Sequence, residues 1–276
     1  MTAALAPTAV ARVDEAASIG DLAVRCLELE MTTYPKPGLV SPVDSGSHAD
    51  MDIGTFRRSV TALRPYFAAL AEAGAQESGM GRLRVIGLDA EAAMRAATGG
   101  INTHRGAIFG LGLLCAAAGL RTADPAIALG TLVARRWGAD ILQGPELLRS
   151  HGGAARRRYG AGGARLEAAQ GFPNVYEVGV PALQSRDDEA ARVQACFALI
   201  AAVEDTNLLH RGGPDGLQFA QHAARDFLDE GGIGRPDWHD RAVAVHRAFV
   251  ARRLSPGGTA DLLAMSLFVQ ACEAPA

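Results

Sequence analysis

The stretch IGTFRRSVTALRPYFAAL, residues 53–70, decides the fold class, because its large apolar residues recur at every third or fourth position. Ile53, Phe56, Val60, Leu63 and Phe67 then fall on one face of a helix that has 3.6 residues per turn. The same spacing marks residues 19–29 and several later segments, and no run alternates in the way that a strand would. The sequence therefore predicts an all-α, single-domain, multi-helix globular bundle.

Capping residues, prolines and glycines predict where the helices begin and end. The expected helices are one capped by Asp50 and Asp52, one that starts at Asn102 or Thr103 and ends near Gly119, one that follows a capping box of Ser185 and Asp188 and runs through Val203, one that Pro214 opens and that reaches Leu228, one over 238–249, and a last one after 255–258. Polar loops are expected at 34–50, 98–105, 151–174, 205–216 and 255–261. A polar site built from loops at helix ends follows from this arrangement.

Composition limits the classes of partner. The 276 residues are 49% hydrophobic and 21% charged, and the net charge of −3 provides no field that would gather nucleic acid or an acidic membrane. The N-terminus lacks a signal-peptide pattern, and the four cysteines lie far apart without a CxxC pair. We expect a cytoplasmic protein with reduced cysteines, residues 1–9 disordered, and residues 10–276 forming one catalytic domain.

The first chemically suggestive segment follows Glu30 and contains the only lysine among the 27 basic residues. Lys36 lies between two prolines, so its backbone is held in an extended path while its side chain is free to project into a cleft. Asp44 and His48 follow within the same loop. These side chains are suited to bind phosphate, a metal or both, and the alternative is a solvated surface loop whose carboxylates cap helices.

Two glycine-rich segments lead into helix N-termini. TGGINTHRG, residues 98–106, offers backbone N–H groups together with Asn102 and Arg105, and SPGG, residues 255–258, offers Ser255, Gly257 and Gly258. Free N–H groups at a helix N-terminus favour anions. Plain helix capping explains the first segment equally well, and it is not a Walker A loop because GxxxxGK[ST] is absent.

Two further segments combine charge with glycine. Three consecutive arginines stand among glycines in residues 151–165, and this loop suits a polyphosphate or solvent; they are Arg156, Arg157 and Arg158. In the segment 204–213, Asp205 offers a carboxylate to Mg²⁺ and Arg211 offers a clamp to phosphate. Asp261, in the first turn of the last helix, is the second candidate for the metal, or else it stabilises the helix dipole.

Taken together, five strings resemble the triphosphoribosyl-dephospho-CoA synthase family. They are PKPGLV (35–40), SGSH…DM (45–51), GINTHRG (100–106), DTNLLHRGG (205–213) and SPGGTADLLA (255–264), and they cover the chain from about residue 20 to 272. The branch that serves citrate lyase has Asp directly after GLV. Ser41 stands there in this chain, which resembles the branch that serves malonate decarboxylase.

The resemblance implies that ATP and 3′-dephospho-CoA are the substrates, and that the triphosphoribosyl group moves to the 2′-hydroxyl while adenine leaves. The product would be the prosthetic-group precursor for the acyl carrier protein of malonate decarboxylase. Within this reaction, Glu30 or Asp44 is a candidate base and His48 or His104 a candidate acid. Lys36, Arg105, Arg211 and residues 156–158 are candidates for the phosphates, and Asp205 and Asp261 for Mg²⁺.

Two other functions remain open at the level of sequence. A hydrolase of N-ribosyl bonds, similar to ADP-ribosylglycohydrolases, would use comparable carboxylates and Mg²⁺ with water as the acceptor. A non-catalytic subunit that binds CoA or a nucleotide is the second, although the number of loops with paired acidic and basic groups disfavours it. We expect a homodimer, because this is the commonest assembly of soluble proteins.

Overall fold

The computed structural model describes residues 9–121, 126–145, 151–184 and 188–274, and within them the chain is helical and contains no strand. The all-α prediction is confirmed. Disorder was predicted for residues 1–9. Residues 1–8 lie outside the described part, and Ala9 is already the first residue of a helix. The elements are α1 (Ala9–Thr32), α2 (Ile53–Ala75), α3 (Met80–Ala97), α4 (Arg105–Arg121), α5 (Leu129–Gln143), α6 (His151–Tyr159), α7 (Gly163–Ala169), η1 (Val175–Gly179), α8 (Val180–Leu183), α9 (Glu189–Ala202), α10 (Thr206–Asp229), η2 (Gly232–Gly234), α11 (Trp238–Ala251) and α12 (Gly257–Glu273).

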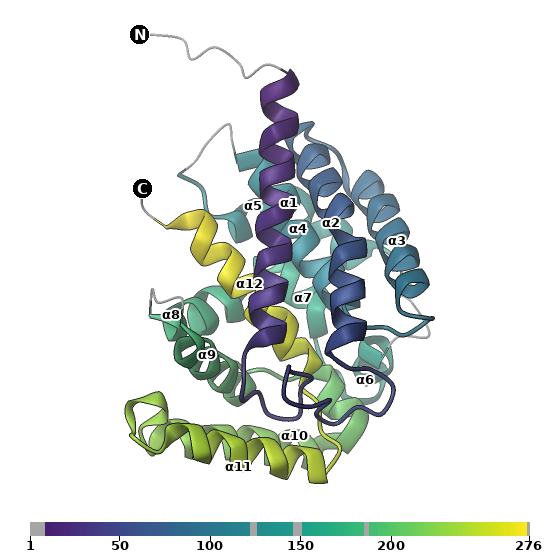
Figure 1. Ribbon diagram of the computed structural model, residues 1–276. Helices are drawn as coiled ribbons and strands as arrows, with labels where there is room; N and C mark the ends of the chain where they lie inside the picture. Colours follow the sequence, from purple (N-terminus) through teal and green to yellow (C-terminus); the bar gives the residue numbers. More distant parts are fainter. Residues whose placement is uncertain (1–8, 122–125, 146–150, 185–187, 275–276) are drawn as a thin grey trace.

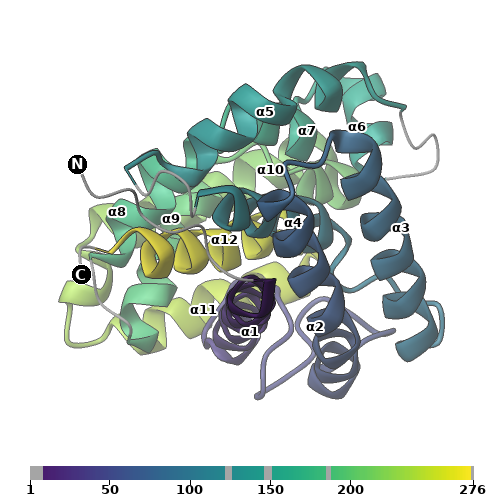
Figure 2. The same cartoon turned by 90° about the horizontal axis from the view of Figure 1, so that it is seen from above.

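Helix α4 is the centre of the bundle (Figure 2). Between the arginines at its two ends its residues are apolar or glycine on all sides and most are buried, as expected for a helix in the core. Helices α2, α12, α5 and α3 pack around it, and α1 packs on α2 and α12. Helices α10 and α11 lie across one end, where the loop between α1 and α2 also lies (Figure 1). That end therefore collects most of the polar segments.

Helices α2 and α4 approach each other so closely that glycine is required on both sides. A Cβ at Gly74 would stand 1.8 Å from the carbonyl oxygen of Ala116, and a Cβ at Gly119 would stand 2.0 Å from that of Ala71. Real Cβ atoms do not come this near to backbone oxygens. The crossing of these two helices is therefore fixed by backbone contact, and it sets the position of α4 in the core.

Aspartates cap several helices. The carboxylate of Asp52 accepts a hydrogen bond from the Thr55 amide at 2.8 Å, so the cap predicted for Asp52 is confirmed. Asp188, predicted as one member of a capping box, is itself the N-cap of α9 and accepts a hydrogen bond from the Ala191 amide at 2.7 Å. The cap predicted for Asp50 is wrong, because Asp52 is the residue adjacent to the first helical turn. Asp50 instead lies 3.6 Å from His48. Ser185, the other member of the predicted capping box, lies outside the described residues.

Three expected boundaries differ from the structure. The predicted loop 151–174 contains α6 and α7, and the predicted loop 205–216 is helical from Thr206. Helix α10 is broken at Gly213, whose φ of 63° and ψ of −164° are not helical, and Pro214 follows this break. Pro214 therefore opens a helical segment that runs to Asp229, which confirms the helix predicted from Pro214 to Leu228. Helix α4 starts at Arg105, later than Asn102 or Thr103.

The apolar helices and the cysteines can be compared with the sequence predictions. In the described residues, no helix is long and apolar enough to cross a membrane. The four cysteines form no disulfide; Cys26, Cys115 and Cys196 are buried and Cys272 is partly buried. Burial raises the pKa of the Cys196 thiol to about 12, so this thiol stays protonated and unreactive at neutral pH.

The α2–α4 contact predicts a contrast between two glycine substitutions. Gly119→Ala should destabilise the protein by about 1–3 kcal/mol, because the added methyl group meets the backbone of Ala71. Gly87→Ala in α3, where a Cβ meets nothing within 4 Å, should stabilise it by about 0.5–1 kcal/mol. Urea unfolding of both variants measures the difference. Equal free energies of unfolding for the two variants would show that α2 and α4 can move apart at no cost in stability.

Candidate active site

A large cavity of about 860 Å³ lies where α4, α10 and α12 begin. This volume is near the upper end of the about 300–1,000 Å³ typical of small-molecule sites. Most of the residues predicted for the site line it, although they come from segments spread over the whole chain: Glu30, Lys36, His48, Asn102, His104, Arg105, Asp205, Arg211, Ser255, Gly257, Gly258 and Asp261. The cavity does not include Asp44, Arg157 or Arg158. The side chain of Arg156 lies outside the described part.

Lys36 is buried beside Glu30. Only 1% of Lys36 and 4% of Glu30 is exposed, and the Lys36 ammonium group donates a short hydrogen bond to Glu30 Oε1. An isolated buried charge costs several kcal/mol, so each group stabilises the burial of the other. The pair joins the last turn of α1 to the loop that follows it and places both charges at the cavity wall.

His246 of α11 holds the loop that contains Lys36, a role that no motif in the sequence indicated. Its Nδ1 lies 2.8 Å from the Lys36 carbonyl oxygen, and its Nε2 lies 3.1 Å from Asp44 Oδ2. Asp44 also accepts a hydrogen bond from the Gly46 amide at 2.9 Å. Asp44 is thus an exposed residue behind the loop, on the far side of His246 from Lys36.

Asp205 joins the N-termini of α10 and α12. Its Oδ1 accepts hydrogen bonds from the Asn207 and Leu208 amides at 2.8 and 3.3 Å, and its Oδ2 accepts from the Thr259 amide and hydroxyl at 2.8 and 3.1 Å. Burial raises the pKa of this carboxyl, and these four hydrogen bonds oppose the rise. Both oxygens are fully engaged in this conformation, so binding a metal would require Asp205 to release a cap.

Asp261 contributes a second carboxyl to the same region. A Cβ at Gly106 would stand 1.9 Å from Asp261 Oδ2, so the carboxyl rests directly on the first turn of α4. Burial, and then the negative charges of Glu30 and Asp205, raise the pKa of Asp261 well above its usual range. Among the described residues, no group of three or more His, Cys, Asp or Glu side chains is arranged to hold a metal ion.

His48 lies between Arg211 and Ser255. Its Nδ1 is 3.1 Å from an Arg211 nitrogen and its Nε2 is 2.8 Å from Ser255 Oγ. Because guanidinium only donates, Nδ1 accepts and Nε2 carries the hydrogen. Burial, reinforced by the charge of Arg211, lowers the pKa of His48. Arg211 also donates to the Ser47 and Arg253 carbonyl oxygens at 3.0 and 2.9 Å, so it binds the surrounding loops together.

His104 is buried and neutral. Burial, and then the charge of Lys36, lower its pKa to about 3. Its Nδ1 lies 2.7 Å from Ser59 Oγ, which also accepts a hydrogen bond from the Thr103 hydroxyl at 2.7 Å. The Ser59 hydrogen is then left for Nδ1, so Nε2 carries the ring hydrogen. This Nε2 has no hydrogen-bond partner among the described residues. A histidine acid needs a protonated ring, which the surroundings of His48 and His104 disfavour.

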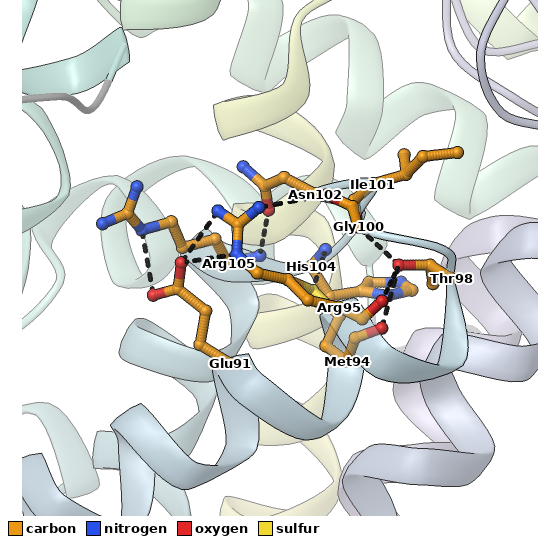
Figure 3. Close-up of polar contacts among 9 residues, drawn as sticks. All are labelled: Glu91, Met94, Arg95, Thr98, Gly100, Ile101, Asn102, His104 and Arg105. Atoms are coloured by element: carbon orange, nitrogen blue, oxygen red, sulfur yellow. Dashed lines mark hydrogen bonds and ion pairs between the residues drawn. The ribbon is translucent and has the colours of Figure 1, made fainter.

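The connection from α3 to α4 is ordered by Glu91, which the sequence did not single out (Figure 3). Glu91 Oε2 lies 3.3 Å from Arg105 Nε, and Glu91 Oε1 accepts hydrogen bonds from Arg95 at 3.0 and 3.2 Å. Asn102 Oδ1 accepts from the Arg105 amide at 3.3 Å. Arg105, predicted as a phosphate ligand, is therefore already held by a carboxylate at the cavity wall.

Comparison with known proteins identifies the family. Residues 16–276 match the CitG family, described as ATP:dephospho-CoA triphosphoribosyl transferase. The chain belongs to this family. It is an enzyme of the transferase class that uses ATP as the ribosyl donor.

Individual relatives cover almost the whole chain. A 2-(5''-triphosphoribosyl)-3'-dephosphocoenzyme-A synthase of Pectobacterium atrosepticum is 38% identical over an alignment of 292 positions, gaps included, that covers 96% of this chain and 94% of the relative. Proteins described as "Probable 2-(5''-triphosphoribosyl)-3'-dephosphocoenzyme-A synthase" are 41% identical in Pseudomonas aeruginosa, with 95% and 92% covered, and 39% identical in Acinetobacter calcoaceticus, with 91% and 90% covered. No solved structure matches the chain.

The glycine- and arginine-rich segment of the transferase contributes less to the cavity than its sequence suggested. Arg165 lines the cavity, but its guanidinium donates to the Ile141, Leu142, Gly144 and Pro145 carbonyl oxygens and so caps the C-terminus of α5. Other lining residues that the sequence left out of the site are Arg84, Leu88, Glu91, Glu167 and Asn174. Their neighbours show no motif, so only the fold reveals them.

The burial of neutral His104 predicts a pH effect on stability. In the unfolded chain a histidine takes up a proton below its ordinary pKa of 6.5, whereas folded His104 does so only near 3. Stability should therefore fall as the pH decreases through this window, by about 2 kcal/mol at pH 5. Urea unfolding measures the free energy of unfolding at pH 7 and at pH 5. Its decrease between these two pH values should be smaller in His104→Gln than in the wild-type protein by this amount. Identical decreases in both proteins would mean that His104 is protonated in the folded state.

Proposed function

We propose that this transferase moves the 5-triphosphoribosyl group of ATP to the 2′-hydroxyl of 3′-dephospho-CoA and releases adenine. The observation that supports this most directly is the convergence of three helix N-termini and buried Lys36 on one cavity. A helix N-terminus carries the positive end of the helix dipole, which favours phosphate groups, although the Asp205 carboxylate already accepts amide hydrogen bonds at the starts of α10 and α12. Two polyanionic substrates need such a site in a protein whose net charge is negative.

The phosphate-binding role falls to the segments at these N-termini. Asn102 and Arg105 stand at the start of α4, and Ser255, Gly257 and Gly258 at the start of α12. Lys36 and Arg211 add positive charge from two loops. Holding both substrates in a reactive arrangement can supply roughly 7–11 kcal/mol of the barrier. Arg157 and Arg158 lie outside the cavity, so we assign them no contact with the reacting groups.

Glu30 is the group that we propose to act on the ribose. The glycosidic bond from the ribose to adenine breaks, the 2′-oxygen of the acceptor bonds to the same carbon, and positive charge develops on the ribose. Glu30 lines the cavity and carries a negative charge that stabilises this state, and it can accept the proton of the attacking hydroxyl. Asp44, the other base candidate, lies behind the loop and outside the cavity.

His48 and His104 serve the departing base as hydrogen-bond donors in this proposal. The Nε2 hydrogen of His104 has no partner among the described residues, whereas that of His48 is directed to Ser255 Oγ at 2.8 Å and must be released before it can bind adenine. Each ring has a lowered pKa, which favours its neutral form. A neutral imidazole can donate a hydrogen bond to an adenine nitrogen without transferring its proton. The proton that adenine finally gains equals the one lost by the acceptor hydroxyl, so the overall reaction is balanced.

We further propose that Mg²⁺ accompanies the triphosphate. Mg²⁺ in such sites takes one or two carboxylates together with phosphate oxygens, and there it would neutralise charge between the substrates. Of the two predicted ligands, Asp261 presents a carboxyl to the cavity, whereas both oxygens of Asp205 are engaged in capping. Asp261 is therefore the residue that we propose to hold the ion.

The place of the product is a separate proposal. We propose that it serves the acyl carrier protein of malonate decarboxylase, because Ser41 occupies the position that is aspartate in the citrate-lyase pattern. Ser41 is buried, and its hydroxyl lies 3.1 and 3.3 Å from the Val43 and Asp44 amides, so it shapes a turn where a carboxylate would carry charge. We also propose that the protein is a homodimer in the cytoplasm. Analytical ultracentrifugation of the purified protein measures its oligomeric state.

One assay separates the three candidate functions. The protein is incubated with ATP, Mg²⁺ and 3′-dephospho-CoA, and adenine and the CoA product are followed by chromatography with mass detection. The transferase releases adenine only when dephospho-CoA is present, with an equal amount of product that is heavier by one triphosphoribosyl group. Adenine release without the acceptor indicates an N-ribosyl hydrolase. Tight binding without turnover indicates a binding subunit.

The two predicted metal ligands should respond differently to substitution. Asp261→Asn should raise the Mg²⁺ concentration for half-maximal rate and lower kcat by about 10²-fold, with little change in thermal stability. Asp205→Asn should mainly lower stability, by about 1–3 kcal/mol, because the amide cannot accept all four hydrogen bonds. Magnesium titrations and thermal unfolding of both variants test this assignment. The reverse pattern would make Asp205 the ligand.

A further inference from the structure

The cavity extends beyond the reacting end into a second region, which we call the outer lobe. It is lined by residues at the N-terminal half of α3, at the C-terminal end of α5 and on α7: Arg84, Gly87, Leu88, Ile141, Gly144, Pro145 and Leu166. Leu88 is 51% exposed and Leu166 is 40% exposed. Few large apolar side chains in the described residues are exposed to this degree, and these two lie on the same cavity.

Arg84 gives the outer lobe a positive charge. Its guanidinium has no hydrogen bond or ion pair among the described residues, and it lies beside Gly144, where a Cβ would stand 2.5 Å from Arg84 Nη2. Arg165 also reaches this region, but carbonyl oxygens at the end of α5 occupy its guanidinium. The outer lobe thus contains the Arg84 guanidinium, which has no partner among the described residues. One helical turn away, Leu88 adds an apolar surface.

The lobe lies at a definite distance from the reacting end. Glu91, which contacts Arg105 at the start of α4, and Arg84 both line the cavity and are seven residues apart on α3. At 1.5 Å per residue the separation along the helix is about 10 Å. A ligand that occupies both ends must therefore be elongated, with a nucleotide at one end and an apolar, flexible extension at the other.

We propose that the outer lobe binds the diphosphate and the pantetheine arm of dephospho-CoA, an assignment that rests on the proposed function. The acceptor reacts through its ribose, so its arm must lead away from the carboxylates around Glu30. Arg84 pairs with the diphosphate, and Leu88 and Leu166 cover the methyl and methylene groups that follow it. ATP has no comparable apolar extension, which assigns the lobe to the acceptor.

Two matched substitutions on α3 test the assignment. Leu88→Ser should raise the KM for dephospho-CoA about five- to tenfold, because a half-exposed leucine no longer gains burial, and should leave the KM for ATP within about twofold. Val85→Ser is the control, since Val85 is 49% exposed on the same helix but does not line the cavity. It should leave both constants unchanged. A rise in the KM for ATP, or no change for either substrate, would overturn the proposal.

A truncated acceptor then separates the arm from the nucleotide. ADP retains the ribose and the diphosphate of dephospho-CoA but lacks the pantetheine arm. With ADP as the acceptor at saturating ATP, Leu88→Ser should no longer lower kcat/KM. Arg84→Gln should lower kcat/KM with either acceptor, because both acceptors carry the diphosphate. An equal penalty of Leu88→Ser with both acceptors would place the nucleotide in the lobe. A wild-type protein that releases no adenine with dephospho-CoA would reject the proposed function itself, which distinguishes the two failures.

Discussion

The buried ion pair between Lys36 and Glu30 is the interaction on which the site depends. A lysine that is 1% exposed in a largely apolar helical core is tolerated only because a carboxylate compensates its charge, and loss of either partner typically costs 3–5 kcal/mol. Glu30 is fixed by α1, so Lys36 must come to it. The loop that carries Lys36 is then secured to α11 by His246 and by the Ser47 hydroxyl, which donates to the Leu254 carbonyl oxygen at 2.6 Å.

The charges around this pair are arranged in two groups. Glu30, Asp205 and Asp261 lie close enough for the first two to raise the pKa of the third, so the deep end is rich in carboxyl groups. Positive charge is offered on the same cavity by Lys36, Arg105, Arg211 and Arg84. A substrate that is anionic at its phosphates and becomes cationic at its ribose fits a cavity that offers charges of both signs.

Sequence patterns revealed the fold class and most of the cavity wall, because short motifs at helix starts stay at helix starts after folding. They could not place Asp44, whose partner His246 is 202 residues away along the chain. They also missed α6 and α7, because glycine-rich segments have weak helix propensity and these two are stabilised by packing against α10 and α5. The segment 151–165 was expected to suit a polyphosphate, yet the role of its last residue, Arg165, depends on carbonyl oxygens 20–24 residues away. Glu91 belongs to no motif.

Core packing and site geometry are one constraint in this protein, as the crossing of α4 and α12 shows. A Cβ at Gly106 would collide with the carboxyl of Asp261, and a Cβ at Gly110, one turn later, would stand 2.2 Å from Met265 Cε. Asp261 and Met265 are likewise one turn apart on α12. The two glycines therefore set how closely α12 approaches α4, and the same approach places Asp261 beside Glu30. Glycine in these helices thus positions a carboxyl group at the reacting end of the cavity, even though no glycine takes part in the chemistry.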